Sequence, residues 1–284
     1  MGAGRLFSSL HSGAVLPFGL SLAFALLLGV VHGITPDEHT WPITFSYAIG
    51  TYSVRGGLIV GGIFALAFTL QRAVLSELAY LGLSRVLSSP AINNPVYIAV
   101  GSAMAIAGYI ALRRAREHHA AGGPPRPFVT PQMAALHGVI AGFGVGAYAL
   151  VLYTVLAPSM PGPAFGFLPG LLFGIGTLII QAPAGALFGY YMRRLHLPDR
   201  SIQSIAARSA GETLYFGGFA FALAGLAGVL WPAAVNWSLP THIAIPNLDS
   251  INIGLVLVIF VVLGIGLTSV ARGVRRERAL LQRS

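Results

Sequence analysis

Residues 14–41 read "AVLPFGLSLAFALLLGVVHGITPDEHTW". Eighteen nearly unbroken apolar residues, from Ala14 to Val31, are followed at once by two histidines, an aspartate and a glutamate within residues 32–39. A helix of about 20 apolar residues crosses the roughly 30 Å hydrocarbon core of a bilayer. This stretch therefore predicts a membrane-spanning helix that ends in a polar joint, a name we keep for residues 32–39.

The composition of the whole chain agrees with this expectation. The 284 residues are 55% hydrophobic and only 9% charged, whereas soluble globular chains carry about a quarter charged residues. We therefore expect an all-α, polytopic transmembrane helix bundle, with residues 1–284 forming one integral membrane domain. Cysteine is absent, which excludes disulfides and thiolate metal sites. The first apolar region is long and has no small-x-small cleavage site after it, so we expect a retained span rather than a signal peptide.

Long apolar runs predict about eight spans, of which the second is weak and could be a re-entrant segment. Their expected ranges are 14–34, 36–54, 56–80, 94–112, 132–157, 166–191, 213–232 and 251–271.

Charge predicts the orientation of these spans. The net charge of +9 comes from arginine alone, and the arginines gather in two loops, 113–130 and 193–212, and in the tail 272–284. Positive segments stay on the cytoplasmic side, so eight spans place both termini in the cytoplasm and the protein in the cell membrane. Because the arginines are interpreted as an orientation signal, the positive charge does not predict a nucleic-acid partner. Nothing in the sequence predicts an oligomeric state.

A faint internal repeat is present. "VHGI" (31–34) is similar to "LHGV" (136–139), and "GGIFALAFTL" (61–70) is similar to "PGLLFGIGTL" (169–178). Under this alignment, 31–112 and 132–232 form a possible 3+3 inverted repeat with one flanking helix at each end. Such repeats are common in secondary transporters. Chance similarity between short glycine-rich segments is the alternative.

The polar joint offers a set of candidate ligands. His32, Asp37, Glu38 and His39 surround Pro36, which is expected to break the helix because it lacks an N–H group. Imidazole and carboxylate suit nickel, cobalt, zinc or iron better than alkali ions. The alternative is a solvated turn in which Asp37 only caps the next helix.

Other polar residues fall within expected spans, where burial is costly and function is the default hypothesis. Gln71, Arg72 and Glu77 lie in the third span; Arg72 could pair with Glu77, or either could approach Asp37 or Glu38. The alternative is that this helix leaves the membrane near Gln71 and continues along its surface.

Two further residues lie in later spans. Gln181 precedes Pro183, which suggests another interrupted helix; its side chain could contact a substrate or form an interhelical hydrogen bond. His137 is expected at the cytoplasmic end of its span, as an interfacial histidine or an inner-gate ligand.

The joint also carries a family resemblance. "HGITPDEH" resembles the His-x4-Asp-His signature of the nickel/cobalt transporter family, including its relatives named as urease-accessory-like membrane proteins. His32, Asp37 and His39 match the signature, with Glu38 inserted. "GLLFGIGTLIIQAP" resembles a degraded second signature that retains Thr177 and Gln181, and a Gly-His-Ser element expected at "LAFTLQRA" lacks its histidine. The chain therefore resembles a diverged member.

This resemblance implies a secondary transporter for a divalent transition-metal cation, with His32, Asp37 and His39 as ligands. The metal ion would be a transported substrate and not a resident cofactor, and the lipid bilayer would be the other partner. No nucleotide loop or familiar hydrolase motif is present, so we expect a protein that is not an enzyme. An intramembrane metalloenzyme and a non-catalytic membrane assembly factor remain the alternatives.

Overall fold

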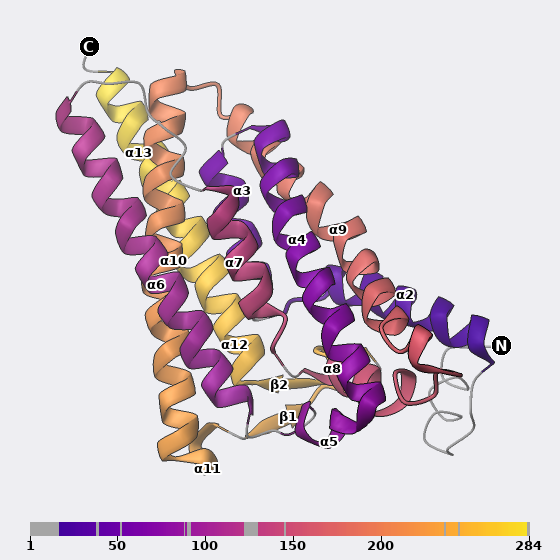
Figure 1. The fold of residues 1–284 in the computed structure, drawn as a ribbon. Coiled ribbons are helices and arrows are strands. Elements are labelled where there is room, and N and C mark those ends of the chain that lie inside the picture. Colours follow the sequence, from indigo (N-terminus) through magenta and orange to yellow (C-terminus); the bar gives the residue numbers. More distant parts are fainter. Residues whose placement is uncertain are drawn as a thin grey trace.

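The computed structural model describes residues 17–37, 40–51, 53–87, 89, 92–121, 130–144, 146–235, 237–243 and 245–282, with backbone alone for 117–121 and 234. The described chain is helical apart from one short β-hairpin (Figure 1). Its long apolar helices confirm that the chain is a multi-span helical membrane protein that contacts the lipid bilayer. Five helices of the described part are long and apolar enough to cross a membrane: Val54–Leu87, Asn93–Arg116, Pro163–Arg193, Asp199–Leu230 and Ile253–Leu281.

These long helices are built from several elements. The first comprises α4 (Val54–Leu78), a π-helical turn η1 (Ala79–Leu83) and α5 (Ser84–Leu87), and the second is α6 (Asn93–Ala121). The third comprises η4 (Pro163–Phe165) and α9 (Leu168–Arg193). The fourth is α10 (Asp199–Leu230), and the short helix α11 (Pro232–Val235) follows it. The last comprises α12 (Ile253–Ile259), the π-helical η5 (Phe260–Leu267) and α13 (Thr268–Leu281).

The other expected spans are short helices. They are α2 (Phe18–Ile34), α3 (Trp41–Thr51), α7 (Pro131–Ala141) and α8 (Ala147–Val151), the last continuing into η3 (Leu152–Leu156). The expected continuous span 132–157 is therefore wrong, because the helix is interrupted between α7 and α8. The interruption reads "GFGVG" (142–146), and each glycine costs about 1 kcal/mol in a helix relative to alanine.

Two other sequence expectations need correction. α9 runs through Pro183 without interruption, which membrane helices tolerate when neighbouring groups satisfy the freed backbone. The arginine-rich segments 113–130 and 193–212 are also helical over part of their length, because α6 continues to Ala121 and α10 begins at Asp199.

Two antiparallel helix pairs make up much of the bundle: α4 with α9, and α6 with α10 (Figure 1). Glycines let each pair approach closely. A Cβ atom at Gly57 would lie 2.2 Å from the carbonyl oxygen of Gly185, and one at Gly101 would lie 2.4 Å from the backbone nitrogen of Ala222. Small residues of this kind drive helix association in membranes, where van der Waals packing replaces the hydrophobic effect.

The short helices pack around these pairs. α2 packs on α9, α7 packs on α4, and α3 contacts α10, α9 and α4. The hairpin of β1 (Ser238–Pro240) and β2 (Ser250–Asn252) is antiparallel, with Ser238 opposite Asn252. Its connecting segment, 241–249, lies over the end of α2.

Candidate functional site

The break between α2 and α3 places His32 and Asp37, the two described ionisable residues of the polar joint, inside the protein. α2 ends at Ile34, and Thr35 is extended (φ −74°, ψ 143°), as expected for a residue that precedes proline. Asp37 then starts α3: its Oδ1 accepts a hydrogen bond from the Thr40 backbone N–H at 3.0 Å. The capping role proposed as an alternative for Asp37 is thus present. Asp37 itself is not solvated, however, because it is only 4% exposed.

His32 and Asp37 meet within this joint. The Nδ1 atom of His32 lies 3.8 Å from Oδ2 of Asp37, and His32 is 3% exposed. The imidazole is held by aromatic rings, with centroids 5.0 Å from Phe173, 5.2 Å from Tyr148 and 5.8 Å from Phe68. An ionisable pair is therefore buried where two short helices meet.

A polar cover lies over this pair. Nδ2 of Asn247 is 3.4 Å from Oδ2 of Asp37, and the hydroxyl of Tyr148 donates to the carbonyl of Pro246 at 3.0 Å. A further 3.0 Å hydrogen bond links the hydroxyls of Tyr148 and Thr35. Segment 241–249 thereby closes one side of the joint.

Sequence reasoning did not identify Thr35, Tyr148 or Asn247. Only Asn247 carried a usable signal, since it lies in a polar turn, "PNLDS", and adopts a left-handed conformation (φ 64°) that asparagine tolerates. Tyr148 lay within an expected apolar span and gave no such signal.

The remaining candidate ligands, Glu38 and His39, lie outside the described residues. Within the described part of the chain, no group of three or more histidine, aspartate or glutamate side chains could hold a metal ion. The ligand set expected from the family resemblance therefore stays a prediction.

Arg72 is buried against two of the same aromatic rings. It is 4% exposed, and its Cζ atom lies 4.9 Å from the ring centroid of Phe68 and 5.7 Å from that of Phe173. Its Nη1 donates to the hydroxyl of Tyr153 at 2.7 Å, and its Nη2 donates to the carbonyl of Gly144 at 2.9 Å. His32 and Arg72 thus share Phe68 and Phe173.

The neighbours of Arg72 on α4 were also candidates. Gln71 is 8% exposed, and α4 continues without a break to Leu78. The expected Arg72–Glu77 ion pair is not among the ion pairs of the described residues. Both polar atoms of the Gln71 amide, and Oε2 of Glu77, are buried without a hydrogen-bond partner.

Thr177 and Gln181 connect α9 to α2. The hydroxyl of Thr177 lies 3.2 Å from the carbonyl of Gly29, and Nε2 of Gln181 lies 3.4 Å from the carbonyl of Gly33. This arrangement agrees with the interhelical alternative for Gln181. The two side chains brace the helix that presents His32.

His137 belongs to a different set of contacts. It is 2% exposed, and its Nδ1 faces both the hydroxyl of Tyr47 and the carbonyl of Met133. His137 is therefore buried between α7 and α3.

The site thus combines an imidazole, a carboxylate, an amide and a phenol around a helix break. A guanidinium packs against two phenylalanine rings that also contact the imidazole. Such a set can bind a cation or exchange protons. Comparisons of the chain with known family models, with curated proteins and with solved structures find no match.

Proposed function

We propose that the protein is a secondary transporter that moves a divalent transition-metal cation, nickel-like or cobalt-like, through the polar joint. The observation that carries this proposal is the His32–Asp37 pair, buried at a proline-interrupted helix break with 3.8 Å between Nδ1 and Oδ2. Ionisable groups are costly inside a membrane protein and mark substrate or ion pathways. A structural role alone would be served by an uncharged cap.

The chemistry of the pair favours a transition metal. Imidazole nitrogen with carboxylate oxygen is a ligand set of intermediate softness, which binds nickel, cobalt or zinc more readily than sodium or potassium. Glu38 and His39 follow directly in the chain and would complete the ligand set. Asn247, whose amide already faces Asp37, would contribute its oxygen after rotation of the side chain.

Contacts between the helices support alternating access through an inverted repeat. Gly61 packs on the backbone of Gln181, and Gly170 packs on the carbonyl of Arg72. Both equivalent pairs, Gly61 with Gly170 and Arg72 with Gln181, are 109 residues apart (170 − 61 and 181 − 72). Any two antiparallel helices in contact give such equal separations, and a two-fold axis between the repeats is one arrangement that produces them.

The other helices follow the same relation. Gly29 packs on the carbonyl of Phe173 and Gly138 on that of Phe64, again 109 residues apart (138 − 29 and 173 − 64). In α6 and α10, "GSAMAIAG" (101–108) matches "GFAFALAG" (218–225). These contacts favour a separation of 109 residues between equivalent positions. This separation is one helical turn longer than the one between the histidines of the two similar motifs, His32 and His137 (137 − 32 = 105). A rocking motion of one half against the other would open the joint to each side in turn.

Arg72 favours a second candidate, transport of a small anion. Among the described residues no carboxylate lies within 4.0 Å of its guanidinium, and its Nε has no hydrogen-bond partner. A buried charge without a counter-charge costs several kcal/mol, and an anionic substrate would offset that cost. The same transport assay separates the two candidates.

The decisive experiment is uptake into liposomes that contain the purified protein. Nickel, cobalt, zinc and manganese are offered to the wild type and to His32→Ala and Asp37→Asn, with His196→Ala, an exposed histidine, as the matched control. We expect uptake of at least one metal by the wild type and the control, and its loss in both joint variants.

Other outcomes each select another function. Uptake of none of the four metals, or equal uptake by all variants, contradicts the proposal. Uptake of a small anion that requires Arg72 would select the second candidate. A metal-dependent hydrolytic activity of the purified protein would select a metalloenzyme, and full cellular function without His32 would select an assembly factor.

A further inference from the structure

A second charged site lies away from the polar joint, where α10 and α13 run side by side (Figure 1). α10 has 32 residues and is therefore about 48 Å long, well beyond the roughly 30 Å hydrocarbon core. Its first turns carry Arg200, Arg208 and Glu212, so this charged end is the part that extends outside the core. The arginine-rich α13 packs beside it.

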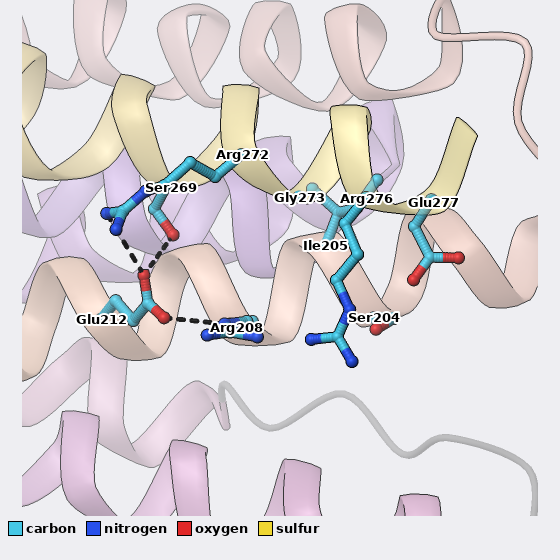
Figure 2. A pocket seen from close by; sticks show the side chains of 9 residues that line it. All are labelled: Ser204, Ile205, Arg208, Glu212, Ser269, Arg272, Gly273, Arg276 and Glu277. Carbon is cyan, nitrogen blue, oxygen red and sulfur yellow. Dashed lines mark hydrogen bonds and ion pairs between the residues drawn. The ribbon is translucent and has the colours of Figure 1, made fainter. Parts of the chain in front are cut away.

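A cavity of about 210 Å³ separates the two helices at this end. Its polar lining comprises Ser204, Arg208 and Glu212 from α10, and Ser269, Arg272, Arg276 and Glu277 from α13, so three arginines outnumber two glutamates (Figure 2). We call this cavity the arginine pocket. A water molecule occupies about 30 Å³ in the liquid, so the pocket has room for a phosphate group.

Glu212 organises one end of the arginine pocket. Its Oε1 accepts from Nε of Arg208 at 2.7 Å, and its Oε2 accepts from the hydroxyl of Ser269 at 2.6 Å (Figure 2). Nη2 of Arg272 lies 3.9 Å from the same Oε2. Glu212 engages Arg208 through Nε alone, which leaves the terminal amino groups of that guanidinium with donor capacity.

Arg276 lies at the other end. It follows Arg272 by one helical turn on the same face of α13, and its side chain extends over Ser204 in Figure 2. Arg276 is in none of the ion pairs of the described residues. The pocket therefore contains three guanidinium groups that can donate hydrogen bonds. The carboxylate of Glu212 engages two of them, those of Arg208 and Arg272.

We propose that the arginine pocket binds a phosphate group, either the headgroup phosphate of an anionic phospholipid or free phosphate. Guanidinium groups bind phosphate oxygens through paired, charge-assisted hydrogen bonds. Basic pockets between membrane helices hold lipid headgroups in this way. Exposed apolar side chains on the same helix, Phe260, Leu263 and Leu267, would contact the acyl chains of a bound lipid.

Native mass spectrometry of the full-length protein tests this inference. The protein in detergent receives phosphatidylglycerol, phosphatidylcholine or inorganic phosphate. The test variant is Arg276→Gln, and the control is Arg275→Gln, which removes the same charge from an exposed neighbour that does not line the pocket. Loss of a charge-assisted contact should weaken binding of the anionic ligand by about fivefold or more in the test variant, and by less than about twofold in the control.

The arms of the experiment identify the source of the phosphate. Retention of phosphatidylglycerol, but not phosphatidylcholine, with loss in Arg276→Gln identifies a lipid headgroup. Retention of inorganic phosphate alone, with the same loss, identifies free phosphate. Equal weakening by both arginine variants would mean diffuse surface attraction, and that result, or no binding of either anion, overturns the proposal. This site does not depend on the transport proposal.

Discussion

Substitution of Gly101 by alanine tests the packing of α6 against α10. A Cβ atom there would lie 2.4 Å from the backbone nitrogen of Ala222 and 2.5 Å from the carbonyl oxygen of Gly218. Both are backbone atoms, so no side chain can rotate away, and the helices must separate by roughly 1 Å to restore van der Waals contact. Overpacking of this kind costs about 1–3 kcal/mol. The gain in helix propensity from Gly101→Ala returns only about 1 kcal/mol.

Gly62→Ala on α4 is the matched control, because a Cβ atom there meets nothing within 4 Å. It receives the same gain in helix propensity without the clash. Thermal denaturation in detergent should therefore rank Gly62→Ala at or above the wild type, and Gly101→Ala below it. Gly218→Ala should match Gly101→Ala, since its Cβ would meet Ala105 and Gly101 in the reciprocal arrangement. Equal melting temperatures for Gly101→Ala and Gly62→Ala would refute the close approach of the two helices.

Three further predictions concern the polar joint. Asp37→Asn should abolish metal uptake while leaving the melting temperature nearly unchanged, because asparagine caps α3 as well as aspartate does; Asp37→Ala should in addition lose about 1 kcal/mol of stability in a denaturation assay. Arg72→Gln should lower the KM for the metal by about tenfold or more, because it removes a buried positive charge that repels the bound divalent cation; loss of metal uptake in liposomes would contradict this. Asn247→Ala should raise the KM for the metal by more than its loss of stability, measured by fluorescence, can explain. An unchanged KM would remove Asn247 from the site.

Much of the membrane architecture could be predicted from the sequence, because long apolar runs have a simple physical meaning. The expected spans 56–80, 94–112, 166–191 and 213–232 overlap the observed helices α4, α6, α9 and α10. The interruption between α7 and α8 was missed, since "GFGVG" (142–146) contains no polar residue and hydropathy does not register backbone cost. Pro183 predicts a helix break that α9 does not have, because a proline inside a packed membrane helix does not have to break it.

The candidate site was only partly predictable. The proximity of His32 to Asp37 follows from their short separation and the intervening Pro36. The contacts with Tyr148 and Asn247 join residues 113 and 210 positions apart, and no local pattern in the sequence encodes such contacts. The polar character of Arg72 was evident, but its partners, Tyr153 and Gly144, depend on how α7 ends.

Charge balance explains how a buried arginine and a cation site can coexist in one bundle. Asp37 and Arg72 are the buried formal charges of the described site, and they nearly cancel when His32 is neutral. Arrival of a divalent cation would add positive charge to that balance, and any ligand that is protonated beforehand would have to release its proton as the metal binds. Phe68 and Phe173 contact both His32 and Arg72, and their ring faces attract the guanidinium. The arginine would then favour release of the metal once the joint opens, because its charge opposes tight binding without competing for the carboxylate.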